Sequence, residues 1–79
     1  MAVNLSEIIF FHRKKSGLTQ KQLATLAGVG KNVIYELESG KQTIRLDTLL
    51  KILIILNIEI DFRSPLGATF MQEQRHENG

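Results

Sequence analysis

The residues able to do chemistry in this chain are polar and charged side chains, and few belong to the types that catalyse reactions. There is no cysteine, which excludes disulfides and cysteine-ligated metal sites. The two histidines, His12 and His76, are far apart in sequence and have no metal-binding spacing. No nucleophile–base set, catalytic carboxylate pair or phosphate-cradling loop is evident. We therefore expect neither an enzyme nor a cofactor or metal.

Charge is unevenly distributed along the 79 residues, although the formal net charge is only +2. Between residues 10 and 45 the basic residues outnumber the acidic ones seven to two, whereas from residue 46 onward three basic residues face five acidic ones. A basic region of this kind suits a polyanion such as nucleic acid. A solvated charged surface explains the same distribution, so charge alone leaves both interpretations open.

Four helices are predicted to position these basic residues, because residues that begin and end helices recur along the chain. Asn4 with Glu7, and Thr19 with Gln22, have the spacing of capping boxes. Gly28 suits a left-handed helix end and a tight turn. The predicted helices cover residues 5–16, 19–28, 31–39 and 46–56, each with apolar residues at helical spacing.

The stretch after the fourth helix alternates apolar and charged residues over 58–63, which is the period of a half-buried strand. A lone strand has no partner within the chain, and the fourth helix is apolar on nearly every side. Both features predict a homodimer in which the strand pairs with its own copy. The residues expected at this dimer interface are Ile54, Ile58, Ile60 and Phe62.

Two short helices joined by a glycine turn within about twenty residues are typical of a helix-turn-helix, whose second helix enters the DNA major groove. The segments at 17–24, 27–29, 34–41 and 46–52 resemble the lambda-repressor/Cro-type (XRE) helix-turn-helix family. The resemblance covers residues 5–57 and implies an all-α fold, a compact four-helix lambda-repressor-like DNA-binding domain, to which one short C-terminal β-strand is added. That strand resembles HipB-type antitoxins, which implies a HipA-type Ser/Thr-kinase toxin as partner.

The start of the third helix is where side chains would face the groove. Lys31 and Asn32 are the first candidates for base contacts, since lysine can donate to guanine and asparagine can pair with adenine. Tyr35 and Glu36 lie one turn further along. Phosphate contacts are expected at the start of the second helix and after the third, from Gln20, Lys21, Ser39, Lys41, Gln42 and Thr43. The alternative is that all of these are ordinary solvated residues.

The resemblance bears on one residue pair and one glycine, and helix geometry bears on two adjacent phenylalanines. Arg13 and Glu38 match a structural salt bridge of the family, which assigns Arg13 to architecture. Gly30 stands where the family often has serine or threonine, so a hydroxyl able to contact phosphate is missing. The adjacent Phe10 and Phe11 cannot both face one core, which indicates either a wide apolar face or a docking site for a toxin.

The hypothesis is a sequence-specific DNA-binding repressor that sits as a homodimer on a palindromic operator and doubles as an antitoxin. A stand-alone regulator, such as a phage repressor or restriction-modification controller, and an interaction module without DNA binding remain alternatives. Residues 1–65 are expected to form the DNA-binding and dimerisation domain, and 66–79 a flexible polar tail. No secretion signal or membrane span is seen, which predicts a cytoplasmic, nucleoid-associated bacterial protein.

Overall fold

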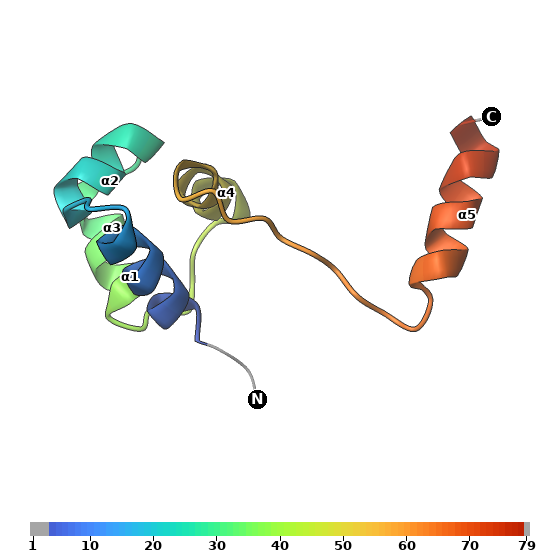
Figure 1. Ribbon diagram of the computed structural model, residues 1–79, viewed down its shortest axis with the longest axis horizontal. Helices are drawn as coiled ribbons and strands as arrows, with labels where there is room; N and C mark the ends of the chain where they lie inside the picture. The colour runs from blue at the N-terminus through green and yellow to red at the C-terminus, as the bar shows by residue number, and fades with distance from the viewer. Residues whose placement is uncertain (1–3, 79) are drawn as a thin grey trace.

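The computed structural model describes residues 4–78, with side chains described as far as residue 74. Five helices follow one another: α1 (Leu5–Lys15), α2 (Gln20–Ala27), α3 (Lys31–Glu38), α4 (Leu46–Ile55) and α5 (Gly67–Asn78). Figure 1 shows α1 to α4 gathered together, whereas α5 stands apart at the end of an extended segment. The predicted all-helical class is confirmed, but the predicted count of four helices is wrong.

Local capping explains where the first two helices begin. The side chain of Asn4 accepts a hydrogen bond from the backbone N–H of Ser6 at 2.9 Å and caps α1. Thr19 Oγ1 accepts from the backbone N–H of Gln22 at 3.0 Å, and Gln22 Oε1 accepts from the N–H of Thr19 at 2.8 Å. The capping box predicted for α2 is therefore formed. The one predicted for α1 is only half formed among the described residues, because Asn4 alone supplies the cap.

The hydrophobic core lies between the first four helices. Its largest fully buried side chains are Ile9, Leu23, Ile34 and Ile52, one from each of α1, α2, α3 and α4. Each of these four helices therefore contributes a large aliphatic side chain whose burial stabilises the fold by about 1.5–3 kcal/mol. The smaller or less central members of the core are Ala24, Ala27, Leu37, Leu53 and Leu56.

The outer side of α4 carries an apolar stripe that the rest of the chain leaves open. Leu46, Leu50 and Ile54 recur every four residues along one face of the helix and are 64%, 40% and 72% exposed. We call these three residues the α4 stripe. From its sequence, this helix is apolar on nearly every side and is expected to be buried only in part by its own chain. The α4 stripe is the part that remains exposed.

The chain leaves α4 through Asn57, whose positive φ of 58° is the left-handed conformation expected at a helix end. Residues 58–64 then run without helix or strand to α5. The strand predicted over 58–63 is thus wrong for the single chain, because nothing in the described part of the chain offers it a ladder of backbone hydrogen bonds. Ile58 is half-buried against the core, whereas Phe62 is 89% exposed.

The segment predicted as a flexible polar tail, residues 66–79, contains the helix α5 (Gly67–Asn78), which the sequence did not predict. Ala, Met, Gln, Glu and Arg, which favour helix, make up most of it. Its apolar residues do not recur at helical spacing, so periodicity gave no sign of it. No residue of α5 belongs to the hydrophobic core of the described chain. None of the described helices has the length and apolar character needed to cross a bilayer.

Candidate nucleic-acid interface

A tight turn fixes the angle between α2 and α3. Gly28 ends α2 with φ +71°, a left-handed conformation that costs a residue with a Cβ about 1–2 kcal/mol. The N–H groups of Gly28 and Val29 donate to the carbonyl oxygens of Thr25 and Ala24 at 3.2 and 3.0 Å. Val29 is half-buried against the core. Because the turn is anchored on both sides, α3 is presented to solvent at a set angle.

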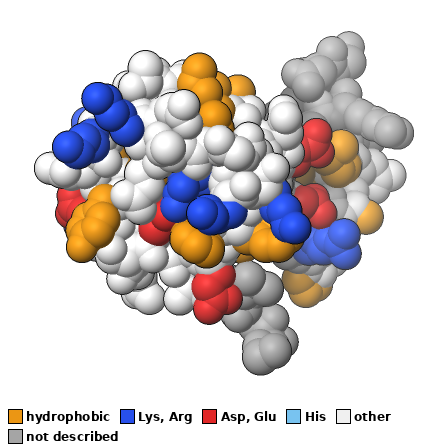
Figure 2. Space-filling model, turned by 60° about the vertical axis from the view of Figure 1, so that its left-hand side comes forward, with side chains coloured by type: hydrophobic (Ala, Val, Ile, Leu, Met, Phe, Trp, Pro, Cys, Tyr) orange, Lys and Arg blue, Asp and Glu red, His pale blue; other side chains and the backbone are white. Residues whose placement is uncertain are grey.

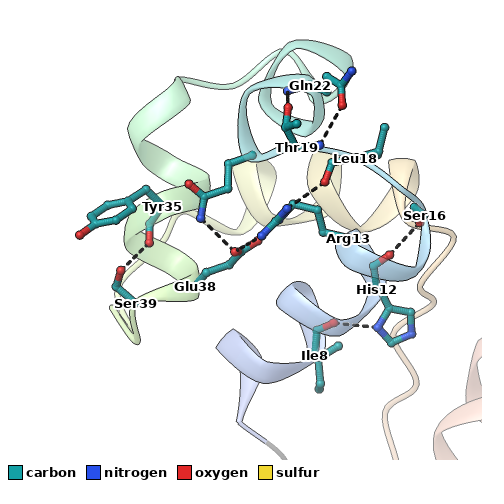
Figure 3. Close-up of polar contacts among 11 residues, drawn as sticks. Ile8, His12, Arg13, Ser16, Leu18, Thr19, Gln22, Tyr35, Glu38 and Ser39 are labelled. Carbon is teal, nitrogen blue, oxygen red and sulfur yellow. Dashed lines mark hydrogen bonds and ion pairs between the residues drawn. The ribbon is translucent and has the colours of Figure 1, made fainter.

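A buried ion pair joins α1 to the last turn of α3 (Figure 3). Arg13 Nε and Nη2 donate to the two carboxylate oxygens of Glu38 at 2.6 and 2.9 Å, and Arg13 Nη1 donates to the carbonyl oxygen of Leu18 at 2.8 Å. The two side chains are only 9% and 5% exposed. Burial alone raises the pKa of Glu38, but hydrogen bonds from Arg13 and Gln20 outweigh it, so this pKa lies below its ordinary value.

The same carboxylate also holds the first residue of α2. Gln20 Nε2 donates to Glu38 Oε1 at 3.0 Å, so α1, α2 and α3 are tied together at one point. An ionised carboxylate can only accept, which fixes the amide of Gln20 with its NH₂ group toward Glu38. Gln20 is half-buried and therefore has less freedom to contact a phosphate than its place at the start of α2 suggests.

The outward face of α3 carries the residues expected to contact bases. Lys31, Asn32 and Tyr35 are exposed, with Tyr35 60% exposed, and Glu36 is half-exposed. Lys31 and Asn32 make no side-chain hydrogen bond within the described part of the chain, so their donors and acceptors are available to a ligand. Gly30 caps α3 without a side-chain hydrogen bond.

Besides Gln20, three of the expected contact residues, Glu36, Ser39 and Lys41, are bound to neighbours within the chain. Lys41 Nζ donates to Glu36 Oε2 at 2.8 Å, with the two side chains 52% and 44% exposed. Ser39 Oγ donates to the carbonyl oxygen of Tyr35 at 2.8 Å, so its hydroxyl is used at the end of α3 (Figure 3). Gln42 and Thr43 are exposed in the loop that follows.

A basic hollow lies beside the start of α2. Its lining includes Lys14, Lys21 and Lys31, together with Thr19 and Gln20, and its volume is about 600 Å³. Figure 2, which turns the α1–α3 side of the molecule forward, shows separate groups of Lys and Arg side chains with hydrophobic and acidic side chains between them. Free backbone N–H groups at the start of a helix favour an anion, so this hollow suits a phosphate.

The comparisons with known proteins place this arrangement. The helix-turn-helix family model matches residues 12–63, which include α2, the turn and α3. The chain belongs to the helix-turn-helix family. Its type is that of the XRE regulators.

Two curated relatives of this helix-turn-helix chain are similar over most of its length. An uncharacterized HTH-type transcriptional regulator, y4mF, of Sinorhizobium fredii is 36% identical over 62 residues, which are 78% of this chain and 82% of the relative. An uncharacterized HTH-type transcriptional regulator of Haemophilus influenzae is 36% identical over 69 residues, which are 87% of this chain and 60% of that relative.

Two basic residues outside the expected set of contacts lie near the helix-turn-helix: Lys14, which the sequence suggested was a solvated or weakly phosphate-facing charge, and Arg45, for which it suggested no role. Lys14, on α1, lines the basic hollow, and Arg45 lines a smaller hollow with Lys41 and Thr43. Arg45 also donates to the carboxylate of Asp47 at 3.1 Å. Neither position carries a motif of its own. The only sequence signal is a positive charge on the element next to α2 or α3, which is too common to single out.

Proposed function

We propose that this helix-turn-helix protein is a transcriptional repressor that places α3 in the major groove of a palindromic operator. The observation that carries the proposal is the outward face of α3, where Lys31 and Asn32 project without internal partners. The turn at Gly28 and the ion pair of Arg13 with Glu38 hold that face at a fixed orientation. A rigid polar face of this kind suits direct recognition of base edges.

The basic hollow beside α2 supplies the phosphate contacts that accompany the base contacts of α3. Lys14, Lys21 and Lys31 lie around it, so a phosphate seated there would be close to three positive charges. Phosphate contacts fix how a protein sits on the duplex, and base contacts then discriminate between sequences. We infer that this hollow and the loop with Lys41, Gln42 and Thr43 hold backbone phosphates on either side of α3.

The operator is proposed to be an inverted repeat because the chain acts as a homodimer. Two copies would place their α3 helices about 34 Å apart, one turn of DNA. Of the residues expected at the dimer interface, Ile54, Ile60 and Phe62 are exposed and available for contact. Ile58 is half-buried against its own core and contributes less. Repression follows when the dimer occupies a promoter.

Selection of bound DNA from random oligonucleotides tests this function. We expect an inverted repeat with half-sites one helical turn apart, bound with an affinity that falls steeply as salt rises. The Lys15→Ala variant is a control that removes one positive charge outside the basic hollow. Lys15 lies on α1 over the ring of Phe11 and does not line that hollow. Binding that shows neither sequence preference nor salt dependence would contradict the proposal.

A toxin-binding role on a second surface is the further part of this proposal. Phe10 and Phe11 are 49% and 55% exposed on α1, and both rings lie beside cations, at 5.5 Å from Arg13 and 5.6 Å from Lys15. Neither ring lines the basic hollow. The resemblance to HipB-type antitoxins favours a HipA-type kinase as the occupant.

Calorimetry with a HipA-type kinase tests the toxin-binding role. The natural chain should bind the kinase, and Phe11→Ser should abolish the heat of binding while operator binding persists. Unchanged affinity of the variant would mean that the kinase docks away from Phe11, and no binding by the natural chain would leave the repressor as a stand-alone regulator.

A further inference from the structure

Two apolar surfaces of this chain are uncovered in a single copy. One is the α4 stripe, whose three side chains are 40–72% exposed. The other belongs to the C-terminal arm, which we define as residues 58–78, and consists of Ile60, Phe62, Leu66, Phe70 and Met71, 42–89% exposed. Contiguous apolar surface of this extent on a soluble protein marks a binding surface.

The arm carries its apolar residues away from the stripe of its own chain. Residues 58–64 are extended, and an extended chain rises about 3.3 Å per residue, so this segment spans about 20 Å. Figure 1 shows α5 at the far end of it, separated from α4. Whatever covers the stripe must therefore come from elsewhere.

Antiparallel pairing of these extended segments places opposite charges across from one another in two registers. With the two-fold axis at Phe62, Asp61 lies opposite Arg63 of the second copy. With the axis at Asp61, Glu59 lies opposite Arg63, and cross-strand pairs of opposite charge are favourable. The axis at Asp61 also brings the two Asp61 side chains together, a like-charge contact that the ion pair of each with Arg63 of its own chain, at 2.9 Å, offsets.

The register with its axis at Asp61 brings apolar residues together and delivers α5 to the other copy. Ile60 lies opposite Phe62, so the two exposed apolar side chains of the segment cover one another. Leu66 follows the extended segment, on the side where α4 of the second copy ends at Leu56. The start of α5 therefore arrives beside the C-terminal end of α4 in the second copy, and not beside its own.

We propose that α5 of each copy packs on the α4 stripe of the other, so that the dimer is held by reciprocal exchange of C-terminal arms. This inference rests on the homodimer of the proposed function and assigns its interface. The lengths agree, because at about 1.5 Å per residue the twelve residues of α5 span about 18 Å and the stripe about 12 Å. Leu66, just before α5, and Phe70, within it, are four residues apart and so lie on the same side of the helix.

Charge and area support the same occupant. Lys51 is exposed on α4 next to Leu50, and Glu73 is exposed on α5 three residues after Phe70, so the two helices carry complementary charges. A standard interface buries about 800 Å² per partner, and one aromatic side chain buries about 150–250 Å². Phe62 and Phe70, with the six exposed aliphatic side chains of the two surfaces, are enough to reach that size.

Disulfide cross-linking of the full chain tests the exchange, because the natural sequence has no cysteine. The double variant Leu50→Cys/Phe70→Cys is oxidised in the absence of DNA and analysed under denaturing, non-reducing conditions. We expect most of the protein to run as a covalent dimer, with mass spectrometry showing residue 50 joined to residue 70. The matched control is Leu26→Cys/Phe70→Cys, since Leu26 is equally apolar and 57% exposed on α2, and it should keep its thiols free.

Two results overturn the proposal. A covalent monomer means that α5 folds back on its own α4, and free thiols in a protein that sediments as a dimer mean that another surface joins the copies. In either case operator selection still reports on the repressor function, because that experiment does not depend on where α5 lies. Phe70→Asp provides a second measurement without cysteine, and we expect it to raise the dimer dissociation constant at least tenfold.

Discussion

Lys41 Nζ lies 2.8 Å from Glu36 Oε2, so a residue expected to contact phosphate is bound to a residue expected to contact a base. The pair lies where α3 ends and the loop begins, with both side chains about half-exposed. Its own contribution to stability is small, about 0.2–1 kcal/mol, because solvent screens exposed ion pairs. Its effect on the proposed DNA complex is expected to be larger, since Lys41 offsets the negative charge of Glu36 on the face that we propose approaches DNA.

Lys41→Ala should therefore weaken binding to all DNA sequences alike and lower the slope of log affinity against log salt by about one. The variant also leaves the carboxylate of Glu36 without its cation, which adds repulsion to the lost phosphate contact. Glu36→Gln in the same chain should restore part of the affinity. Fluorescence anisotropy at several salt concentrations measures both effects, and a loss confined to the operator would assign Lys41 to base recognition instead.

Asn32→Ala should cost about 1–3 kcal/mol on the operator and much less on non-specific DNA. The reason is that Asn32 is exposed near the start of α3 and has no internal partner to lose, so the folded domain should keep its stability. Binding to a panel of operators with single base changes would show the loss of preference at one position. Equal weakening on operator and non-specific DNA would mean that Asn32 does not contact a base.

Arg13→Met should destabilise the fold by about 3–5 kcal/mol, because it leaves the carboxylate of Glu38 buried without its cation. The double variant Arg13→Met/Glu38→Leu should lose less, since no buried charge remains. It should still lose some stability because the carbonyl oxygen of Leu18 no longer accepts the hydrogen bond from Arg13 Nη1. Chemical denaturation of the two variants measures the difference, and equal losses would contradict this account of the pair.

The acid side of the stability profile should depend on Glu38. Its pKa is lowered in the folded state, so its contribution is complete above the ordinary glutamate value of about 4.3 and is lost as the pH falls through the folded pKa. Glu38→Gln should be less stable than the natural chain at neutral pH, and the gap should narrow below about pH 4. If the difference in unfolding free energy between the two proteins stays constant down to pH 2, the Glu38 carboxyl is not responsible for the loss of stability in acid.

Gly30→Ser should stabilise the domain by a few tenths of a kcal/mol, because α3 of the natural chain lacks a side-chain cap and a serine hydroxyl would supply one. The backbone at Gly30 has φ −65°, which any residue adopts, and an added Cβ would meet only Val33 Cγ2 at 3.7 Å. Gly28→Ala is the contrasting control and should lose about 1 kcal/mol or more, since its φ of +71° is left-handed. Thermal denaturation of the two variants measures their unfolding free energies against that of the natural chain.

The four core helices could be predicted from sequence because their ends depend on neighbours a few residues away. Thr19, Gln22, Gly28 and Asn57 each specify a local geometry that the structure reproduces. α5 could not be predicted in this way, because none of its described residues belongs to the hydrophobic core and the apolar residues within it follow no helical period. The alternation over 58–63 is real, but a strand exists only when a second backbone pairs with it.

The exposed face of α3 also followed from the sequence, since apolar spacing decides which side of a short helix turns inward. Apart from the pair of Arg13 with Glu38, which the family resemblance implied, the links between distant residues could not be predicted from the sequence. Gln20 and Glu38, or Glu36 and Lys41, are separated by a turn or a helix end, and only the fold shows that they bind one another. The role of Gln20 changes most, because a residue tied to the interior is less available to phosphate.

Lys31 and Asn32 take no part in holding the described fold together. Substitutions at these two positions therefore carry little penalty for folding, and under the proposed function the preferred DNA site can diverge between related chains while the scaffold stays the same. The residues that set the orientation of α3, by contrast, tolerate little change. A DNA-binding regulator that reads bases in the proposed way acquires new target sites through a pair of outward side chains and retains its architecture through the network behind them.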